Sequence, residues 1–416
     1  MTFEFTKYTL TIQLDSIGTL TIALCMLLCG YSLRKRVPLL QRLCLPDVVI
    51  GGLIFMMVRT ALHIAGIIEL EMDITFQSPA MIAFFTCIGL MTSLQRDNIA
   101  VSKLLLKYWG VCAFLAIMQN LIGLGTAIAL RISPVYGILA GTTTMMGGHG
   151  NGSAFGLTAS NLGFSNGQEI GIACATFGML CGALIGSPFA YSLIDRYHLT
   201  PLKHKAVNTP SFERDILKDC QSSRSKTHYL IKNLFIIASI MVIGSWLASF
   251  VSVFLKNIVL PEYIGGMFLG LTVRNTVGSK YKKLVDQNAI SDLSNVFLNI
   301  FLSISMVSVE LWKLKDIAVA LLVILLIQVV FILLYSRFFV FRILGNDYDS
   351  AVMCAGLIGH GLGATPNAIA NMDSIGEKYG DSNVAMFIVP AVASSLIDLV
   401  MIPTIVIFFN FAVSLS

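Results

Sequence analysis

The sequence predicts an all-α polytopic membrane protein, built from two inverted repeats of five transmembrane helices, each with a re-entrant segment. Three observations predict this fold class. The 416 residues are 56% hydrophobic and only 12% charged, whereas roughly a quarter of the residues in a soluble domain are charged. Basic residues gather in alternate loops between apolar stretches, and several unusual motifs occur twice, roughly 210 residues apart.

The apolar stretches give the expected helices in chain order, because a crossing helix needs about 20 apolar residues. Ten full crossings are predicted at 17–33, 46–68, 79–95, 108–130, 170–194, 229–255, 261–273, 293–311, 317–341 and 384–409. Two further stretches, 135–162 and 350–372, are apolar but rich in Gly, Thr, Ser and Asn. Irregular backbone persists at membrane depth only where it lines a cavity or is buried in protein. We therefore expect these two stretches to be re-entrant.

The loop charges predict the orientation. With the N-terminus outside, ten crossings place 20 of the 28 basic residues in inner loops and seven, Arg59 and Lys378 among them, in outer ones. Cytoplasmic loops carry an excess of Lys and Arg, so both termini are expected on the outer side. Arg59 is expected to extend its guanidinium to the outer headgroups.

Composition and motifs exclude several classes of protein. The nine cysteines include no C-x-x-C pair and mostly lie in apolar runs, so we interpret them as small buried hydrophobes rather than ligands or disulfide partners. The chain has no Walker motif, G-x-S-x-G or H-E-x-x-H, and it is not expected to be an enzyme or an ATP-driven pump. The net charge of +5 reflects orientation rather than nucleic-acid binding, and neither a transition metal nor a cofactor is expected.

Repeated motifs divide the chain into domains. Leu45-Pro46-Asp47 with Gly51-Gly52 returns as Leu260-Pro261-Glu262 with Gly265-Gly266, and Gly148-His149-Gly150-x-Gly152 returns as Gly359-His360-Gly361-x-Gly363. We expect an N-terminal repeat over 1–194, a cytoplasmic connector over 195–228 and a C-terminal repeat over 229–416. Because five crossings are an odd number, the second repeat is inverted. Inverted repeats with interrupted helices are typical of secondary transporters.

The two glycine motifs are expected to interrupt helices, so that new half-helices begin near Ser153 and near Ala364. Free N–H groups and the positive dipole end at such starts bind carboxylates. Exposed carbonyls, hydroxyls and amides suit a small cation such as Na⁺. The alternative is that the glycines only allow close helix packing. The candidate substrate-binding residues are Gly150, Asn151, Gly152, Ser153, Gly363, Ala364, Thr365, Asn367 and Asp398, and the candidate Na⁺ ligands are Thr142, Thr143, Thr144 and Asn371.

Asp398 is the carboxylate well inside an apolar span, and such a charge is by default a functional candidate. It could pair with a substrate ammonium or bind Na⁺, or it could be a structural hydrogen-bonding group. Gln119 and Gln328, at matching repeat positions, are expected to bond between helices rather than to substrate. His149 and His360 are expected to be neutral imidazoles bonded to backbone.

At these residues the sequence resembles the bacterial sodium/glutamate symporter family. The resemblance covers nearly the whole chain, and the strings that carry it are 45–52, Ala83-Phe84-Phe85 with Ile88-Gly89-Leu90, Met146-Gly147-Gly148-His149-Gly150, 173–178, 361–366, 368–372 and Val389-Pro390 leading to Ile397-Asp398. It implies Na⁺-coupled uptake of L-glutamate across the cell inner membrane. It also implies a homodimer in which a mobile domain moves like an elevator against a dimeric scaffold.

Two residues depart from the pattern of that family, and three other functions remain possible. Asn151 and Asn367 stand where threonine is expected in the family pattern, which leaves substrate preference and cation stoichiometry open. The alternatives are a carrier of another organic anion such as a hydroxycarboxylate, a cation or proton exchanger, and a channel whose glycine segments form a filter.

Overall fold

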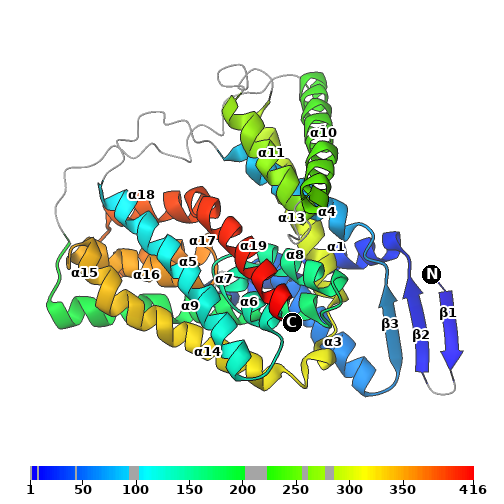
Figure 1. Cartoon of the computed structure of the whole chain (residues 1–416), viewed down its shortest axis with the longest axis horizontal. Helices are drawn as coiled ribbons and strands as arrows, with labels where there is room; N and C mark the ends of the chain where they lie inside the picture. Colours follow the sequence, from blue (N-terminus) through cyan, green and yellow to red (C-terminus); the bar gives the residue numbers. More distant parts are fainter. Residues whose placement is uncertain are drawn as a thin grey trace. The chain divides into compact units, whose positions relative to one another are not determined.

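The computed structural model describes residues 2–6, 9–42, 45–92, 103–201, 223–254, 261–276 and 285–416. These residues are helical almost throughout (Figure 1). The chain falls into two compact units: unit 1 is Met1–Asp73, Ala100–Lys205 and Ser305–Ser416, and unit 2 is Ile74–Ile99 and Ala206–Ile304. Each unit thus contains segments of both predicted repeats. Most of the predicted connector lies outside the described residues.

The helices of unit 1 follow the apolar stretches of the sequence. Its first half contains α1 (Ser16–Arg36), α2 (Pro38–Arg42), α3 (Asp47–Ile64), α5 (Lys103–Ala129), α6 (Pro134–Leu139), α7 (Thr142–Met145), α8 (Gly148–Asn161) and α9 (Gly167–Tyr197). Its second half contains η3 (Leu311–Leu314), α14 (Ala318–Tyr335), η4 (Ser336–Val340), α15 (Phe341–Leu344), α16 (Tyr348–Leu362), α17 (Thr365–Tyr379), α18 (Asn383–Ala391), η5 (Val392–Leu396) and α19 (Asp398–Leu415). Both η4 and η5 are π-helical turns.

Unit 2 contains α4 (Gln77–Met91), α10 (Ser223–Phe254), α11 (Glu262–Thr276) and most of α13 (Gln287–Ser308), whose last residues belong to unit 1. Inside unit 2, α11 packs against both α4 and α10. A small apolar core between these helices contains Ala83, Leu90, Ile237 and Ile290.

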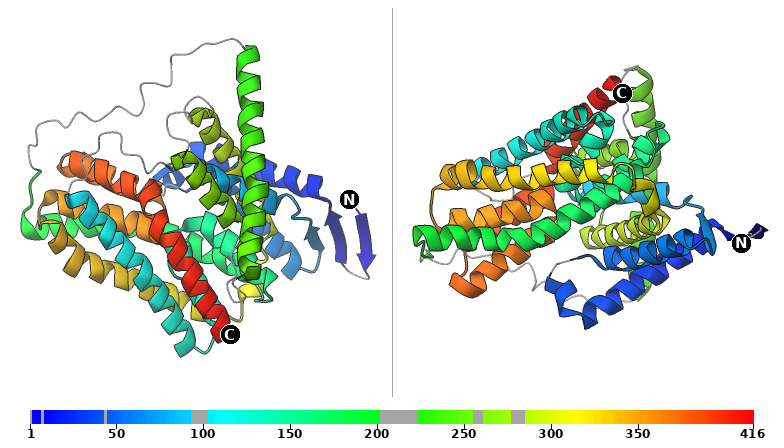
Figure 2. Two further views of the ribbon diagram at one scale, coloured as in Figure 1. Left: turned by 45° about the horizontal axis from the view of Figure 1, so that its top comes forward. Right: turned by 90° about the horizontal axis from the view of Figure 1, so that it is seen from below.

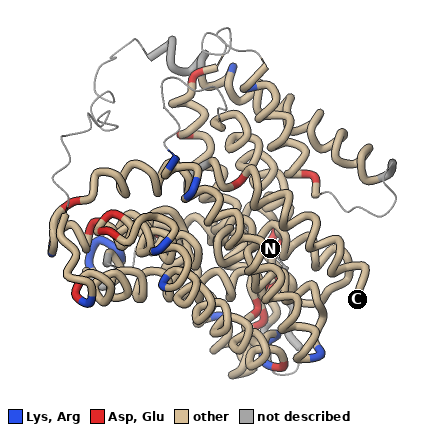
Figure 3. The backbone as a smooth tube through the Cα atoms, turned by 60° about the vertical axis from the view of Figure 1, so that its left-hand side comes forward, with Lys and Arg blue, Asp and Glu red and all other residues tan. Residues whose placement is uncertain are grey.

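Eight helices among the described residues are long and apolar enough to cross a membrane. They are Ser16–Arg36, Asp47–Ile64, Lys103–Ala129, Gly167–Tyr197, Leu230–Ser252, Gln287–Ser308, Ala318–Leu344 and Asp398–Leu415, and charged residues are sparse along them (Figure 3). The chain is therefore a multi-pass membrane protein. Two of the ten predicted crossings, α4 and α11, have 15 helical residues each, or about 22 Å of helix for a core of about 30 Å.

The repeated proline and glycine motif packs in the same way in both halves of the chain. In unit 1, a Cβ on Gly30 of α1 would collide with the carbonyl of Asp47, and one on Gly51 of α3 with the carbonyl of Met26. In unit 2, a Cβ on Gly265 of α11 would collide with the carbonyl of Gly244 in α10. The glycines therefore let each helix pair approach at backbone distance.

A small sheet near the N-terminus is an exception to the all-α prediction. The strands β1 (Thr2–Thr6), β2 (Thr9–Leu14) and β3 (Ile68–Met72) lie in that order, with β1–β2 antiparallel and β2–β3 parallel. Their sequences alternate apolar and polar residues, the pattern of a half-buried strand. This signal was present in the sequence but weak beside the long apolar runs.

Arg59 does not extend to lipid headgroups, so that prediction is wrong. Its side chain is 4% exposed, and its Nη1 donates to the carbonyl of Ser308 at 2.8 Å. Its Nη2 donates to the carbonyl of Leu70 at 2.7 Å and pairs with Glu310 at 2.9 Å. The guanidinium thus satisfies carbonyls left open at the end of α13 and joins α3, β3 and that helix end.

Lys378 was also assigned to the wrong side relative to Arg196. Its ammonium lies 4.6 Å from the ring centre of Tyr191 in α9. The hydroxyl of the neighbouring Tyr379 donates to Asp195 at 2.7 Å, and Arg196 lies in the last turn of the same α9. Lys378 and Arg196 therefore lie near the same end of α9, whereas the loop charges predict that they lie on opposite faces of the membrane.

Candidate functional site

Two interrupted helices of unit 1 meet at Gly148 and Gly363. The first interruption separates α6, α7 and α8 at 140–141 and 146–147, and the second separates α16 from α17 at 363–364. Gly148 has φ +61°, a conformation that favours glycine. A Cβ on it would lie 3.3 Å from the carbonyl oxygen of Gly363. We call this contact the glycine junction.

Helix α9 supports the glycine junction with a line of glycines. It runs alongside α16 (Figure 2). A Cβ on Gly178 would collide with the carbonyl of Leu362, and one on Gly182 would lie 3.0 Å from the carbonyl of Gly359. About two turns closer to the N-terminus than Gly178, Gly171 meets Gly152 of α8 equally closely. Interhelical approach of this kind needs small residues, so α9 positions both interrupted helices at once.

The first interruption does not lie where the sequence predicted it. Gly150, Gly152 and Ser153 are all inside α8, which begins at Gly148, so the predicted start near Ser153 is wrong. The hydroxyl of Ser305 donates to Ser153 at 2.8 Å, and Ser153 therefore faces α13. Glycine costs a helix only about 1 kcal/mol per residue, and close packing on α9 offsets that cost.

The second interruption lies where it was expected. Helix α16 ends at Leu362, Ala364 is the extended residue before α17, and proline occupies the first turn of α17. No side chain caps the start of α17. The hydroxyl of Thr365 instead donates to the carbonyl of Ala393 in η5 at 3.1 Å. In the first turn of α17, Pro366 has no backbone N–H, and the N–H groups of Asn367 and Ala368 donate to the carbonyl of Ala364 at 3.0 and 3.3 Å.

Three buried oxygen atoms near the glycine junction have no hydrogen-bond partner among the described residues: Oδ1 of Asn151, Oδ1 of Asn367 and Oγ1 of Thr143. The amide nitrogen of Asn367 donates to the carbonyl of Met179 at 2.9 Å, and that of Asn151 donates to the carbonyl of Gly147 at 3.3 Å. Each amide is therefore fixed by a bond from its nitrogen, while its oxygen has no hydrogen-bond partner in the described chain. A buried unpaired acceptor costs about 1–3 kcal/mol, which a cation or a donor group could offset.

The other candidate Na⁺ ligands have partners. Thr142 donates to the carbonyl of Ala116 at 2.7 Å, and Thr144 to the carbonyl of Leu139 at 2.7 Å. Asn371 donates to the carbonyl of Gly182 at 2.9 Å and accepts from Ser187 at 3.1 Å.

Asn371 also lies apart from the three threonines. It contacts Gly186 of α9, whereas Met145, next to the threonines, contacts Gly178. Eight helical residues span about 12 Å. The structure therefore does not bring the four candidate Na⁺ ligands together, and it leaves Thr143 as the one of them with an unpaired oxygen in the described chain.

Asp398 begins α19, and Ile397 alone separates it from the π-helical turn η5. Its carboxylate makes no ion pair with any residue that the structure describes. The turn is held on both sides, because Trp109 of α5 donates to the carbonyl of Leu396 at 2.9 Å and Thr365 of α17 donates to that of Ala393. π-helical turns often mark functional sites, and this one links Asp398 to the start of α17.

The repeated pairs of glutamines and histidines behave partly as expected. Gln119 donates to the carbonyl of Gly361 at 2.7 Å, and Gln328 donates to the carbonyl of Gln119 at 2.7 Å, which confirms the interhelical bonding. In the described part of the chain, neither His149 nor His360 bonds to backbone; their Nε2 atoms lie 3.0 Å from the Thr176 hydroxyl and 3.1 Å from the Tyr108 hydroxyl. Nearby helical carbonyls already accept bonds from their own helices, so each imidazole pairs with a neighbouring helix.

Sequence reasoning missed one polar network. Gln168 of α9 donates to the hydroxyls of Ser305 at 3.2 Å and Ser308 at 3.1 Å, and Ser305 donates to Ser153. The network joins α8, α9 and the end of α13. The only available signal was a glutamine at the start of an apolar span, which by itself does not identify partners 140 residues away along the chain.

Comparison with known proteins gives a consistent result. A family model described as "Sodium/glutamate symporter" matches residues 12–381. The sodium/glutamate symporter of Haemophilus influenzae is 36% identical over 391 residues, covering 92% of this chain and 94% of that protein. The sodium/glutamate symporter of Escherichia coli is 35% identical over 394 residues, covering 93% and 96%. This chain therefore belongs to the sodium/glutamate symporter family.

Proposed function

We propose that this protein takes up L-glutamate together with Na⁺ across the cell inner membrane, by exposing one binding site alternately to the two sides. Family membership supports the pair of substrates. The observation that carries the proposal is the glycine junction, where two interrupted helices meet beside buried unpaired oxygens. Transporter sites are typically formed by discontinuous helices from both halves of the chain.

The chemistry of the residues around the glycine junction suggests where glutamate and Na⁺ each bind. Glutamate carboxylates suit the uncapped start of α17 at Ala364 and Thr365, because helix N-termini attract anions. The glutamate ammonium suits Asp398, which follows the π-helical turn joined to Thr365. Hard oxygen atoms suit Na⁺, and the unpaired oxygens of Thr143 and Asn151 supply them. Na⁺ enters as the coupling ion, with no further cofactor.

Inverted repeats, an elevator-like movement, a homodimer and external termini are part of this proposal. The matching glycine contacts of α1 with α3 and of α10 with α11 support an internal duplication. The composition of the two units, each with segments from both halves, suits two bodies that move against each other. The positive-inside distribution of loop charges supports the orientation.

Uptake of labelled L-glutamate into proteoliposomes tests the function. An inward Na⁺ gradient should drive accumulation, and an equal K⁺ gradient should not. Glutamate uptake at the same rate with and without the Na⁺ gradient would overturn the proposal. Citrate or malate outcompeting glutamate would identify an organic-anion carrier instead, and glutamate-independent currents at channel rates would identify a channel.

A further inference from the structure

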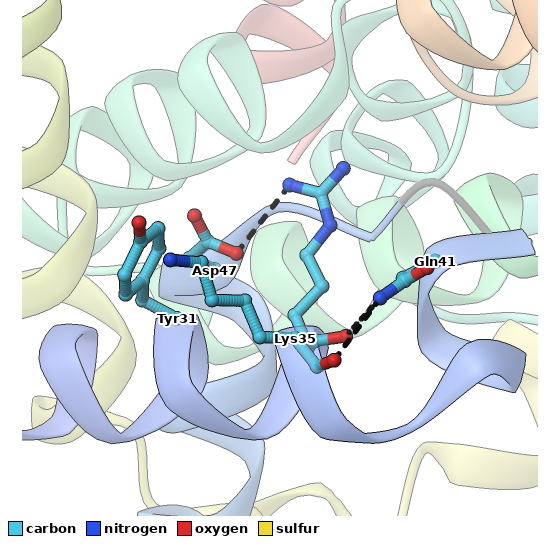
Figure 4. Close-up of a pocket in the computed structure, with 5 residues that line it drawn as sticks. Tyr31, Lys35, Gln41 and Asp47 are labelled. Carbon is cyan, nitrogen blue, oxygen red and sulfur yellow. Dashed lines mark hydrogen bonds and ion pairs between the residues drawn. The ribbon is translucent and has the colours of Figure 1, made fainter.

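A pocket at the end of α1 has a different chemistry from the glycine junction. It is lined by Tyr31, Arg34, Lys35, Gln41 and Asp47 and has a volume of about 370 Å³ (Figure 4). The segment 34–47 contains four basic residues and one acidic residue. The pocket is therefore a positively charged site at what the loop charges predict to be the cytoplasmic face.

The pocket wall is fixed by contacts that leave cationic groups available. Arg34 pairs with Asp47 at 3.4 Å, and Gln41 donates to the carbonyls of Arg34 at 2.9 Å and Lys35 at 3.3 Å. The ammonium of Lys35 lies 4.5 Å from the ring centre of Tyr31. Among the described residues, neither Lys35 nor Arg36 pairs with a carboxylate. These two charges can meet an anion from outside the chain.

An exposed apolar face of α1 continues from the pocket. Ile17, Leu24, Leu28 and Tyr31 are 67%, 37%, 64% and 48% exposed. Their spacing places them on one helix face, in line with Lys35. On the opposite face, Gly30 packs against the start of α3. The face thus presents apolar side chains, then a tyrosine, then basic groups, which is the order of acyl chain, interface and phosphate in a lipid leaflet.

We propose that this pocket binds the phosphate of an anionic phospholipid, whose acyl chain lies along the exposed face of α1. Lys35, which lines the pocket, meets the phosphate oxygens, and Tyr31 lies at the level of the headgroup. Arg36, the next residue of α1, does not line the pocket and adds positive charge next to Lys35. A soluble phosphate would use only the charged pocket. A phospholipid uses both the pocket and the apolar face, and the combination of the two favours the lipid.

The test uses the purified full chain in detergent, with thermal stability as the readout. Phosphatidylglycerol should raise the Tm, while phosphatidylcholine and glycerol phosphate at the same concentration should not. In the double variant K35Q/R36Q, the phosphatidylglycerol concentration needed for half of the shift should rise about 30-fold, because each basic side chain near an anionic headgroup contributes about a fivefold factor. The matched control R342Q, an exposed basic residue of α15, should behave like the unaltered protein.

Four outcomes would overturn the proposal. An equal shift with phosphatidylcholine would remove the need for an anionic headgroup, and an equal shift with glycerol phosphate would make the site one for soluble anions. An unchanged response in K35Q/R36Q would place the lipid elsewhere. Oxidative cross-linking reports on the remaining occupant: Cys25 and Cys29 are exposed free thiols on α1, and efficient disulfide-linked dimers in membranes would show that a second copy covers this face. The readout is binding, so it is independent of transport.

Discussion

Asn367 and Asn371 lie four residues apart on α17, and their amides are used differently. Asn371 has partners for both its nitrogen and its oxygen, while Asn367 has a partner only for its nitrogen. An amide whose nitrogen and oxygen are both hydrogen-bonded stabilises the fold. An amide that is bonded only through its nitrogen leaves a buried oxygen that can accept a bond from a ligand. The two residues therefore provide a matched pair for experiment.

Asn367→Ala should weaken substrate or Na⁺ binding by about 10- to 100-fold, because one buried hydrogen-bonding group corresponds to roughly 1–3 kcal/mol. It should leave the Tm nearly unchanged, because removal of the unpaired buried oxygen offsets loss of the hydrogen bond to the carbonyl of Met179. Asn371→Ala should do the reverse, lowering the Tm because Ser187 and the carbonyl of Gly182 lose their partner. Uptake kinetics and thermal unfolding of both purified variants measure this. If the two variants change the uptake kinetics and the Tm to the same extent, both asparagines have a structural role.

Asp398→Asn should abolish concentrative glutamate uptake while the protein remains in the membrane at normal amount. The reason is that an amide cannot supply the negative charge that an ammonium or Na⁺ requires, and a charge inside an apolar span is costly unless it has a function. Asp316→Asn, at an exposed residue, is the control. Near-normal uptake by the Asp398 variant would make Asp398 a structural residue.

At the scale of elements, α9 is the helix that positions the candidate site. Its glycines contact α8, α16 and α17 in turn, so displacement of α9 would separate the two interruptions. The alternative interpretation of the glycine motifs, close helix packing, is confirmed for Gly152 of α8. It does not apply to Gly148, whose positive φ and contact with Gly363 form the junction itself.

Gly178→Ala should reduce both membrane yield and thermal stability, because its methyl group would collide with the carbonyl of Leu362. Overpacking of this kind costs about 1–3 kcal/mol. Gly110→Ala and Gly125→Ala in α5 are matched controls, since a Cβ at either position meets nothing within 4 Å. Indistinguishable behaviour of the three variants would show that α9 can shift without cost.

At the scale of the whole molecule, the energetics of uptake constrain the coupling ratio. Importing one net negative charge against an inside-negative potential costs about 2.3 kcal/mol per 100 mV, and hundredfold accumulation adds roughly 2.7 kcal/mol. One Na⁺ entering down a tenfold gradient at 100 mV returns about 3.7 kcal/mol. We therefore expect at least two Na⁺ per glutamate. Reversal-potential measurements in proteoliposomes give the ratio directly, and a value of one would contradict the expectation.

The sequence by itself determined the membrane class, the helical segments and the family. These depend on local composition and on strings such as 146–150, which are readable without knowing any contact. The start of α17 was also predictable, because Gly363 and Pro366 act on the backbone next to them. The sheet strands carried a readable alternation too, although they are short.

Only the tertiary structure decided where the first helix is interrupted, how Arg59 is bonded, which candidate ligands have partners, and that Gly148 meets Gly363. A glycine permits a break, a close contact or, at a cost of about 1 kcal/mol, a helix, and packing against the neighbouring helix decides which of these forms. An arginine or amide likewise bonds to whichever carbonyls the fold brings within reach. These outcomes depend on residues far apart in the chain, and the physical reason is that packing, rather than local preference, satisfies buried polar groups.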